Sequence, residues 1–208
     1  MVADYFIKGL IIGFSVAAPV GPIGVLTIKR TLTEGRTSGF VTGMGAAMAD
    51  TVYGIIAGCG LTAISSFLLT QAFWMKLIGG LFLLFLGVKS FLSKPPEKSA
   101  TVVGKGLFYN FISTFFLTVT NPSTILSFLA IFAGMGLGSE KTDYSLSMIL
   151  VLGVFLGSAL WWLILSFTVS FFRSKVTNTH LLWINRLSGI LITAFGLMAI
   201  YTCFNETT

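Results

Sequence analysis

Charged side chains are scarce in this sequence. They make up 10% of its 208 residues, whereas about a quarter of the residues in a soluble domain are charged. Hydrophobic residues account for 55%, and the mean hydropathy is +0.93. These values exclude an ordinary soluble domain. They indicate an integral membrane protein that lies mostly in lipid.

Cysteine and histidine are also rare. The chain has two cysteines, Cys59 and Cys203, both in apolar segments, and one histidine, His180, in a polar loop. Because no Cys pair or Cys/His cluster has ligand spacing, we expect no metal and no cofactor. No histidine lies at membrane depth to act as a base, so we expect no catalytic residues and no enzyme.

The 13 Lys and Arg residues give a net charge of +6, but they are scattered among short loops. No basic arm or helix face forms, so we expect no nucleic-acid partner. The positive charge is better explained by orientation in the membrane.

Long stretches with almost no charge indicate six membrane spans, because about 20 apolar residues cross a bilayer. We expect spans within residues 9–28, 37–75, 73–91, 106–139, 144–172 and 187–205.

A polar linker at residues 93–105 divides the chain into two three-helix repeats, residues 1–92 and 106–208. Pro95 and Pro96 prevent a helix from continuing through it. The last helices of the two halves share one spacing pattern, formed by Trp74, Gly80 and Gly87 in the first half and Trp183, Gly189 and Gly196 in the second.

Three helices per half place the halves in opposite orientations, which is the inverted-repeat plan of many secondary transporters. With the N-terminus outside, ten of the 13 basic residues fall in cytoplasmic loops. This bias predicts that both termini face outward, N-out and C-out, and that the linker is cytoplasmic. Lys29 and Arg30, in the first inner loop, set this orientation or form an inner gate. We interpret Trp161 and Trp162 as packing or interfacial residues, and an aromatic side chain that faces the substrate is the alternative.

The first span contains a predicted break at Pro19, Gly21 and Pro22. Each proline removes a backbone donor, and Gly21 permits unusual dihedral angles. Within lipid, such a break is tolerated where neighbouring helices or water satisfy the freed carbonyls, so broken helices tend to line substrate cavities. A simple packing kink is the alternative.

The fourth span contains a comparable interruption at Thr120, Asn121, Pro122 and Ser123. Asn121 brings hydrogen-bonding groups into an apolar region. Interrupted helices at corresponding positions of two repeats point to a transporter's midplane site, although Asn and Thr could simply cap a kink.

Asp50 is the one acidic residue deep within an apolar stretch. A carboxylate in the bilayer costs roughly 3 kcal/mol or more, so Asp50 should face the protein interior or water. It could carry a proton or bind a substrate amino group. A structural carboxyl group partnered by Tyr53 is the alternative.

Several of these residues resemble the opening signature of the LysE/RhtB family of amino-acid exporters. The similar stretches are Ala18–Pro22, Lys29-Arg30, Gly35-Arg36, Gly43-Met44-Gly45 and Ala49-Asp50, and Asn121-Pro122 stands where the family's second-half Asn-Pro motif is expected. Val20, between Pro19 and Gly21, departs from the family's Ala-Pro-Gly-Pro run.

The resemblance implies a multi-pass carrier of the bacterial plasma membrane that exports amino acids or related small amines, driven by the proton-motive force. It implicates Pro19, Gly21, Pro22, Asp50, Asn121 and Pro122. Expected partners are a small-molecule substrate, protons and lipid, and the small-residue helix faces allow a homodimer. An ion or metal exporter of the same superfamily would need more intramembrane ligands, and a non-transporting sensor would show no proton-dependent flux.

Overall fold

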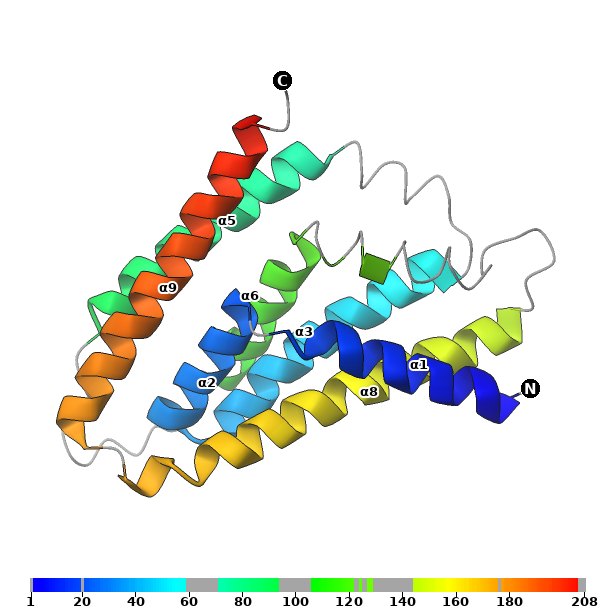
Figure 1. Ribbon diagram of the computed structural model, residues 1–208, viewed down its shortest axis with the longest axis horizontal. Helices are drawn as coiled ribbons and strands as arrows, with labels where there is room; N and C mark the ends of the chain where they lie inside the picture. Colours follow the sequence, from blue (N-terminus) through cyan, green and yellow to red (C-terminus); the bar gives the residue numbers. More distant parts are fainter. Residues whose placement is uncertain are drawn as a thin grey trace.

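The computed structural model describes residues 2–19, 21–58, 71–93, 106–121, 124, 127–128, 144–175 and 177–205. These residues form helices and no strand, which confirms the predicted all-α class for this part of the chain. The elements are α1 (Val2–Ala17), α2 (Pro22–Glu34), α3 (Arg36–Gly58), α5 (Ala72–Phe91), α6 (Leu107–Val119), α8 (Tyr144–Ser170), the 3₁₀ helix η1 (Arg173–Lys175) and α9 (Asn178–Asn205) (Figure 1).

Within the described ranges, four helices are long and apolar enough to cross a bilayer: Arg36–Ile56, Phe73–Phe91, Ser145–Lys175 and Leu182–Asn205. The pair α1 and α2 passes the same test as one bent span, which makes up to five. Of the predicted span 106–139, the structure describes α6 and a few residues beyond it. Six spans, the inverted repeat and the outward termini therefore stay predictions.

The predicted first span, residues 9–28, is two helices rather than one. α1 begins at Val2 and ends at Ala17, α2 begins at Pro22, and the two are bent by 81°. The amide of Ala18 makes the last bond of α1, to the Phe14 carbonyl at 3.0 Å. Proline has no N–H to continue such a ladder, whereas at the first position of a helix it is well tolerated.

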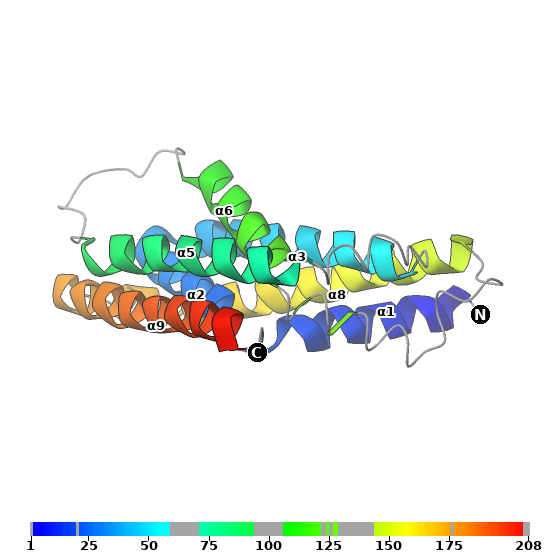
Figure 2. The same ribbon diagram turned by 90° about the horizontal axis from the view of Figure 1, so that it is seen from above.

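The helices pair in a simple pattern (Figures 1 and 2). α3 and α8 lie side by side and antiparallel, and α1 packs against α8 while α6 packs against α3. α5 and α9 form a second antiparallel pair. Within this pair α9 also packs against α2, and this contact connects the pair to the other helices. α2 and α3 are separated by Gly35 alone, whose φ of 111° suits a residue without a Cβ.

Glycines bring these helices into backbone contact. A Cβ atom on Gly13 of α1 would lie 2.0 Å from the carbonyl oxygen of Val154 in α8. Between α5 and α9, a Cβ atom on Gly80 would lie 3.1 Å from the carbonyl oxygen of Gly196, and one on Gly87 would lie 3.0 Å from that of Gly189. Small residues permit the close approach on which helix association in membranes depends.

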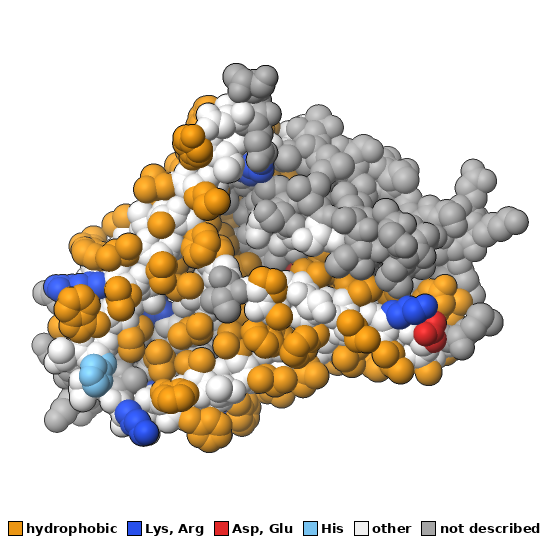
Figure 3. Space-filling view, viewed as in Figure 1, with side chains coloured by type: hydrophobic (Ala, Val, Ile, Leu, Met, Phe, Trp, Pro, Cys, Tyr) orange, Lys and Arg blue, Asp and Glu red, His pale blue; other side chains and the backbone are white. Residues whose placement is uncertain are grey.

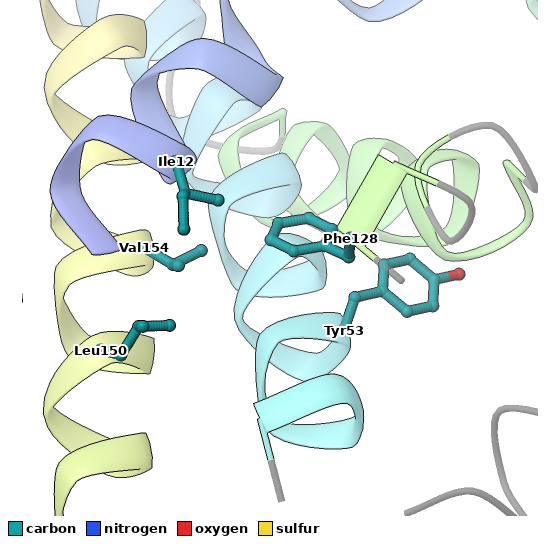
Figure 4. Packing of buried hydrophobic residues seen from close by; sticks show 5 residues of the cluster. All are labelled: Ile12, Tyr53, Phe128, Leu150 and Val154. Atoms are coloured by element: carbon teal, nitrogen blue, oxygen red, sulfur yellow. The ribbon is translucent and has the colours of Figure 1, made fainter. Parts of the chain in front are cut away.

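A hydrophobic cluster joins α1, α3 and α8 (Figure 4). It contains Ile12, Leu150 and Val154, with Tyr53 and Phe128 on its other side. Because these side chains come from segments distant in sequence, the cluster holds the first bent helix against α8 and α3.

The surface is apolar where a soluble protein would be polar. Leu81, Phe85, Leu152 and Ile190 are each about half exposed. Hydrophobic side chains cover much of the visible face, with charged groups mostly toward the helix ends (Figure 3). The interior, in contrast, holds many buried Ser, Thr and Asn residues. This distribution fits a protein surrounded by lipid.

Candidate functional site

A cavity of about 290 Å³ lies where the two interrupted helices meet, and we call it the central cavity. Its walls come from the break between α1 and α2, the middle of α3, the end of α6 and α8. The lining residues are Val16, Ala17, Pro19, Gly21, Pro22, Ile23, Gly24, Ala46, Asp50, Thr118, Asn121, Thr124, Ser127 and Trp162.

Five predicted site residues line this cavity: Pro19, Gly21, Pro22, Asp50 and Asn121. They come from three separate elements of the chain. Their convergence follows from the packing of α2 and α6 against α3. A helix break, a buried carboxyl group and an amide therefore line one cavity.

The first break exposes a helix N-terminus to the cavity. Gly21 caps α2 without a side-chain hydrogen bond, and the first bond of α2 runs from the Val25 amide to the Gly21 carbonyl at 3.1 Å. The amides of Ile23 and Gly24 precede that bond, so they have no acceptor within the helix. Gly21 itself adopts φ −100° and ψ −161°, an extended conformation that any residue can adopt. The conformational freedom that glycine permits at this position is not used in this structure.

Asp50 is buried, with 3% of its surface exposed. Its Oδ2 accepts a hydrogen bond of 2.8 Å from the Ser158 hydroxyl of α8. Tyr53, the alternative partner of Asp50 from the sequence, donates its hydroxyl proton to the carbonyl of Val119 instead. Tyr53 thus satisfies a carbonyl at the end of α6, one of the groups that a helix leaves unpaired.

The remaining predicted residues lie beside the cavity or outside the described residues. Thr120 bonds to the Phe116 carbonyl at 2.9 Å, within its own helix. It lines a second space, which we call the side cavity. Pro122 and Ser123 lie outside the described residues, as does Val20.

α8 contributes two residues that the sequence analysis did not assign to the site. Ser158 bonds to Asp50, and Trp162, one turn later, lines the central cavity. Trp162 packs directly against α3 at Gly43. A Cβ atom added to Gly43 would lie 2.2 Å from the Cβ of Trp162, so this close contact depends on the missing side chain of the glycine. The spacing of four residues between a Ser and a Trp is the only sequence signal, and many helices contain it.

The side cavity, of about 430 Å³, lies between the α5–α9 pair and the ends of α2 and α6. Pro22, Ile23 and Asn121 line both cavities and so form a shared wall. Lys76, Thr120 and Thr202 add polar groups to a lining that is otherwise largely apolar. Among the described residues, no three His, Cys, Asp or Glu side chains form a group that could hold a metal ion.

Apolar helices of spanning length, a bent helix pair and a buried carboxyl group at a cavity between the helices are typical of a membrane carrier. Residues 14–202 match the family described as LysE type translocator, and the chain belongs to that family. It is a multi-pass protein of the cell membrane. Because the members of this family are transporters, the match also supports the expectation that the protein is not an enzyme.

Three relatives match over most of their length. The chain is 25% identical to the "Putative amino acid efflux protein YcgF" of Bacillus subtilis over 197 residues, 93% of each chain. It is 27% identical to the uncharacterized membrane protein YahN of Escherichia coli, over 85% of this chain and 80% of that one. It is 23% identical to the uncharacterized membrane protein YrhP of Bacillus subtilis, over 83% and 87%. No solved structure matches the chain.

Proposed function

We propose that this protein is a secondary-active exporter of amino acids or related small amines, coupled to protons and working by alternating access. The observation that carries the proposal is the central cavity, where Asp50 lies beside both helix interruptions. The family match and the efflux protein of Bacillus subtilis support export.

The cavity offers complementary groups to the two charges of an amino acid. The N-terminus of α2, where the amides of Ile23 and Gly24 have no acceptor within the helix, favours a carboxylate. Asp50 and the carbonyl end of α6 favour an ammonium group. At about 290 Å³ the cavity is at the small end of ligand sites, which suits a small solute.

Asp50 is also the proposed proton carrier. Its burial disfavours a permanent charge. Among the described residues only Ser158 donates a hydrogen bond to it, which leaves other acceptor positions for a proton or an ammonium group. If the two compete for the same carboxylate, release of one follows binding of the other, which is the requirement for antiport. Pro19, Gly21 and Pro22, together with Asn121 and Pro122, would shape the cavity, and Tyr53, Thr120 and Ser123 would support the second break.

The helix contacts support two inverted halves. α1 packs on α8 as α6 packs on α3, and the contact of Gly80 with Gly196 has its counterpart in that of Gly87 with Gly189. A two-fold axis in the membrane plane would produce such reciprocal pairs. Rocking of the halves around the central cavity would then expose it to each side in turn.

Efflux from loaded cells tests the proposal. Cells with and without the protein take up a panel of dipeptides, and free amino acids inside and outside are followed over time. We expect faster release of particular amino acids, and an uncoupler should abolish the difference. Equal release across the whole panel would contradict amino-acid export.

A further inference from the structure

A buried polar cluster joins α2, α3 and α6 between the central cavity and the Gly35 turn that separates α2 from α3. Its centre is Arg30 of α2, with only 4% of its surface exposed. One guanidinium nitrogen, Nη2, donates to the Ser113 hydroxyl at 2.9 Å. The other, Nη1, donates to the Asn110 carbonyl at 3.1 Å and to the hydroxyls of Thr114 and Thr42 at 3.2 and 3.3 Å.

All four acceptors of Arg30 are neutral. No carboxylate among the described residues lies within 4.0 Å of the guanidinium. Glu34 is linked to Arg30 through Asn110, because it accepts a 2.8 Å hydrogen bond from the Asn110 side chain while Arg30 donates to the Asn110 carbonyl. A buried cation normally pairs with an anion, because its desolvation costs several kcal/mol. Arg30 is therefore poised to gain from a carboxylate that reaches it.

The cluster continues a line of buried polar residues that starts at the central cavity. On α6, the Thr118 hydroxyl bonds to the carbonyl of Thr114, one turn closer to Arg30. On α3, Thr42 lies one turn from Ala46, which lines the cavity. On α2, Thr27 lies between Gly24 and Arg30, and its buried hydroxyl has no hydrogen-bond partner among the described residues.

We infer that this line is the route between the central cavity and the cytoplasm, and that Arg30 binds the substrate's carboxylate on that route. The inference rests on the proposed export function. In the present structure Arg30 ties α2 to α3 and α6 and so closes the route. When the helices part, its neutral acceptors separate, and a carboxylate replaces them with a two-bond fork. Export starts at this side, so a substrate meets Arg30 before it meets Asp50.

Accessibility of Thr27 tests the closure without any substrate. Thr27→Cys is placed in a protein with Cys59→Ser and Cys203→Ser, and an uncharged hydrophilic maleimide is applied to inside-out vesicles. We expect slow modification with Arg30 intact and a rate at least tenfold higher with Arg30→Gln. The matched control is Arg36→Gln, which removes an exposed cation near the same end, one that lies over the Phe167 ring. An unchanged rate in Arg30→Gln would overturn the closure.

A second reporter guards against unfolding. Val154 of α8 is fully buried against α1, away from the route. A cysteine at this position, Val154→Cys, should stay unmodified by the maleimide as long as the protein remains folded. If the maleimide modifies Val154→Cys in the Arg30→Gln protein, we use the double variant Ser113→Ala with Thr114→Val in place of Arg30→Gln. The double variant removes two acceptors of Arg30 and keeps its charge. Faster modification at Thr27→Cys alone supports the inference, and no change there contradicts it.

Discrimination between a carboxylate and an amide tests the binding role. Cells are loaded with L-leucine or L-leucinamide, or with the corresponding pair for whichever amino acid the efflux panel identifies. We expect the wild type and Arg36→Gln to prefer the amino acid over its amide. Arg30→Gln should lose at least tenfold in that preference, because its KM for the amino acid rises. Arg30→Lys should recover part of the preference. Full discrimination by Arg30→Gln would refute the role. If wild type exports no amino acid, the proposed function fails, while the maleimide rates still decide the closure.

Discussion

At the scale of single residues, Asp50 shows most clearly which part of a site the sequence reveals and which part depends on tertiary contacts. Its place in an apolar helix makes it a candidate from sequence alone. Its partner, Ser158, is 108 residues away and comes from α8. The contact exists because α3 and α8 pack along their lengths, and no local pattern around either residue encodes it.

Replacing Asp50 by Asn separates its two proposed roles. We expect Asp50→Asn to reduce flux driven by a proton gradient at least a hundredfold in proteoliposomes, because an amide cannot carry the proton. Exchange of labelled for unlabelled substrate needs no net proton movement. It should persist if Asp50 carries the proton alone, and disappear if Asp50 also binds the ammonium group.

The matched control for this variant is Asp4→Asn. Asp4 is exposed and pairs with Lys8 at 2.9 Å on the same helix, far from the cavity lining. It should leave both assays unchanged, and gradient-driven flux at the wild-type rate in Asp50→Asn would remove Asp50 from the mechanism.

At the scale of helices, proline placement made the first break predictable. Pro19 and Pro22 remove donors from any continuous helix, and α2 begins at Pro22. The start of α1 was less predictable. The charged residues Asp4 and Lys8 placed the expected start of the span at residue 9, whereas the helix begins at Val2. In the structure these side chains neutralise each other one turn apart, so the helix tolerates them.

Glycine contacts give a prediction at this scale. Gly13→Ala places a Cβ 2.0 Å from the Val154 carbonyl oxygen, a backbone atom that cannot yield alone. We expect it to destabilise the protein by about 1–3 kcal/mol, as overpacking does. Thermal unfolding of the protein in detergent measures the change.

Gly54→Ala is the matched control for that packing effect. Its added Cβ would meet Val151 at an ordinary 3.6 Å, so the usual helix preference for Ala, about 0.5–1 kcal/mol, should dominate. Equal stability of the two variants would show that the α1–α8 contact is looser than described.

At the scale of the whole molecule, the arrangement of helix ends bears on topology. The ends of α2 and α8 and the start of α3 lie together, and Gly35 between α2 and α3 would bring a Cβ within 3.2 Å of the Arg173 guanidinium. Basic residues thus cluster at one end of the bundle, which is the end that the charge bias assigns to the cytoplasm.

Tags at the two termini test this orientation. We expect epitopes fused to either terminus to be reached by antibody in spheroplasts with an intact membrane, because both termini should face outward. An epitope inserted in the linker 93–105 should be reached only after permeabilisation. Termini protected until permeabilisation would show that the assigned orientation is reversed.

The sequence by itself determined the membrane environment, the all-helical class and the positions where helices must break. Each of these depends on local properties: charge density, apolar length and the missing proline N–H. It also singled out Asp50 and Asn121, because polar groups in apolar segments are costly wherever they lie.

Only the tertiary structure decided which of these residues share a space. The convergence of Pro22, Asp50 and Asn121 on one cavity depends on the packing of α2 and α6 against α3. The cluster around Arg30 depends on the same contacts, since its acceptors are 12 to 84 residues away in the chain. Helix–helix packing is set by side-chain shape along whole faces, so contacts between distant segments cannot be read from the local pattern around either partner.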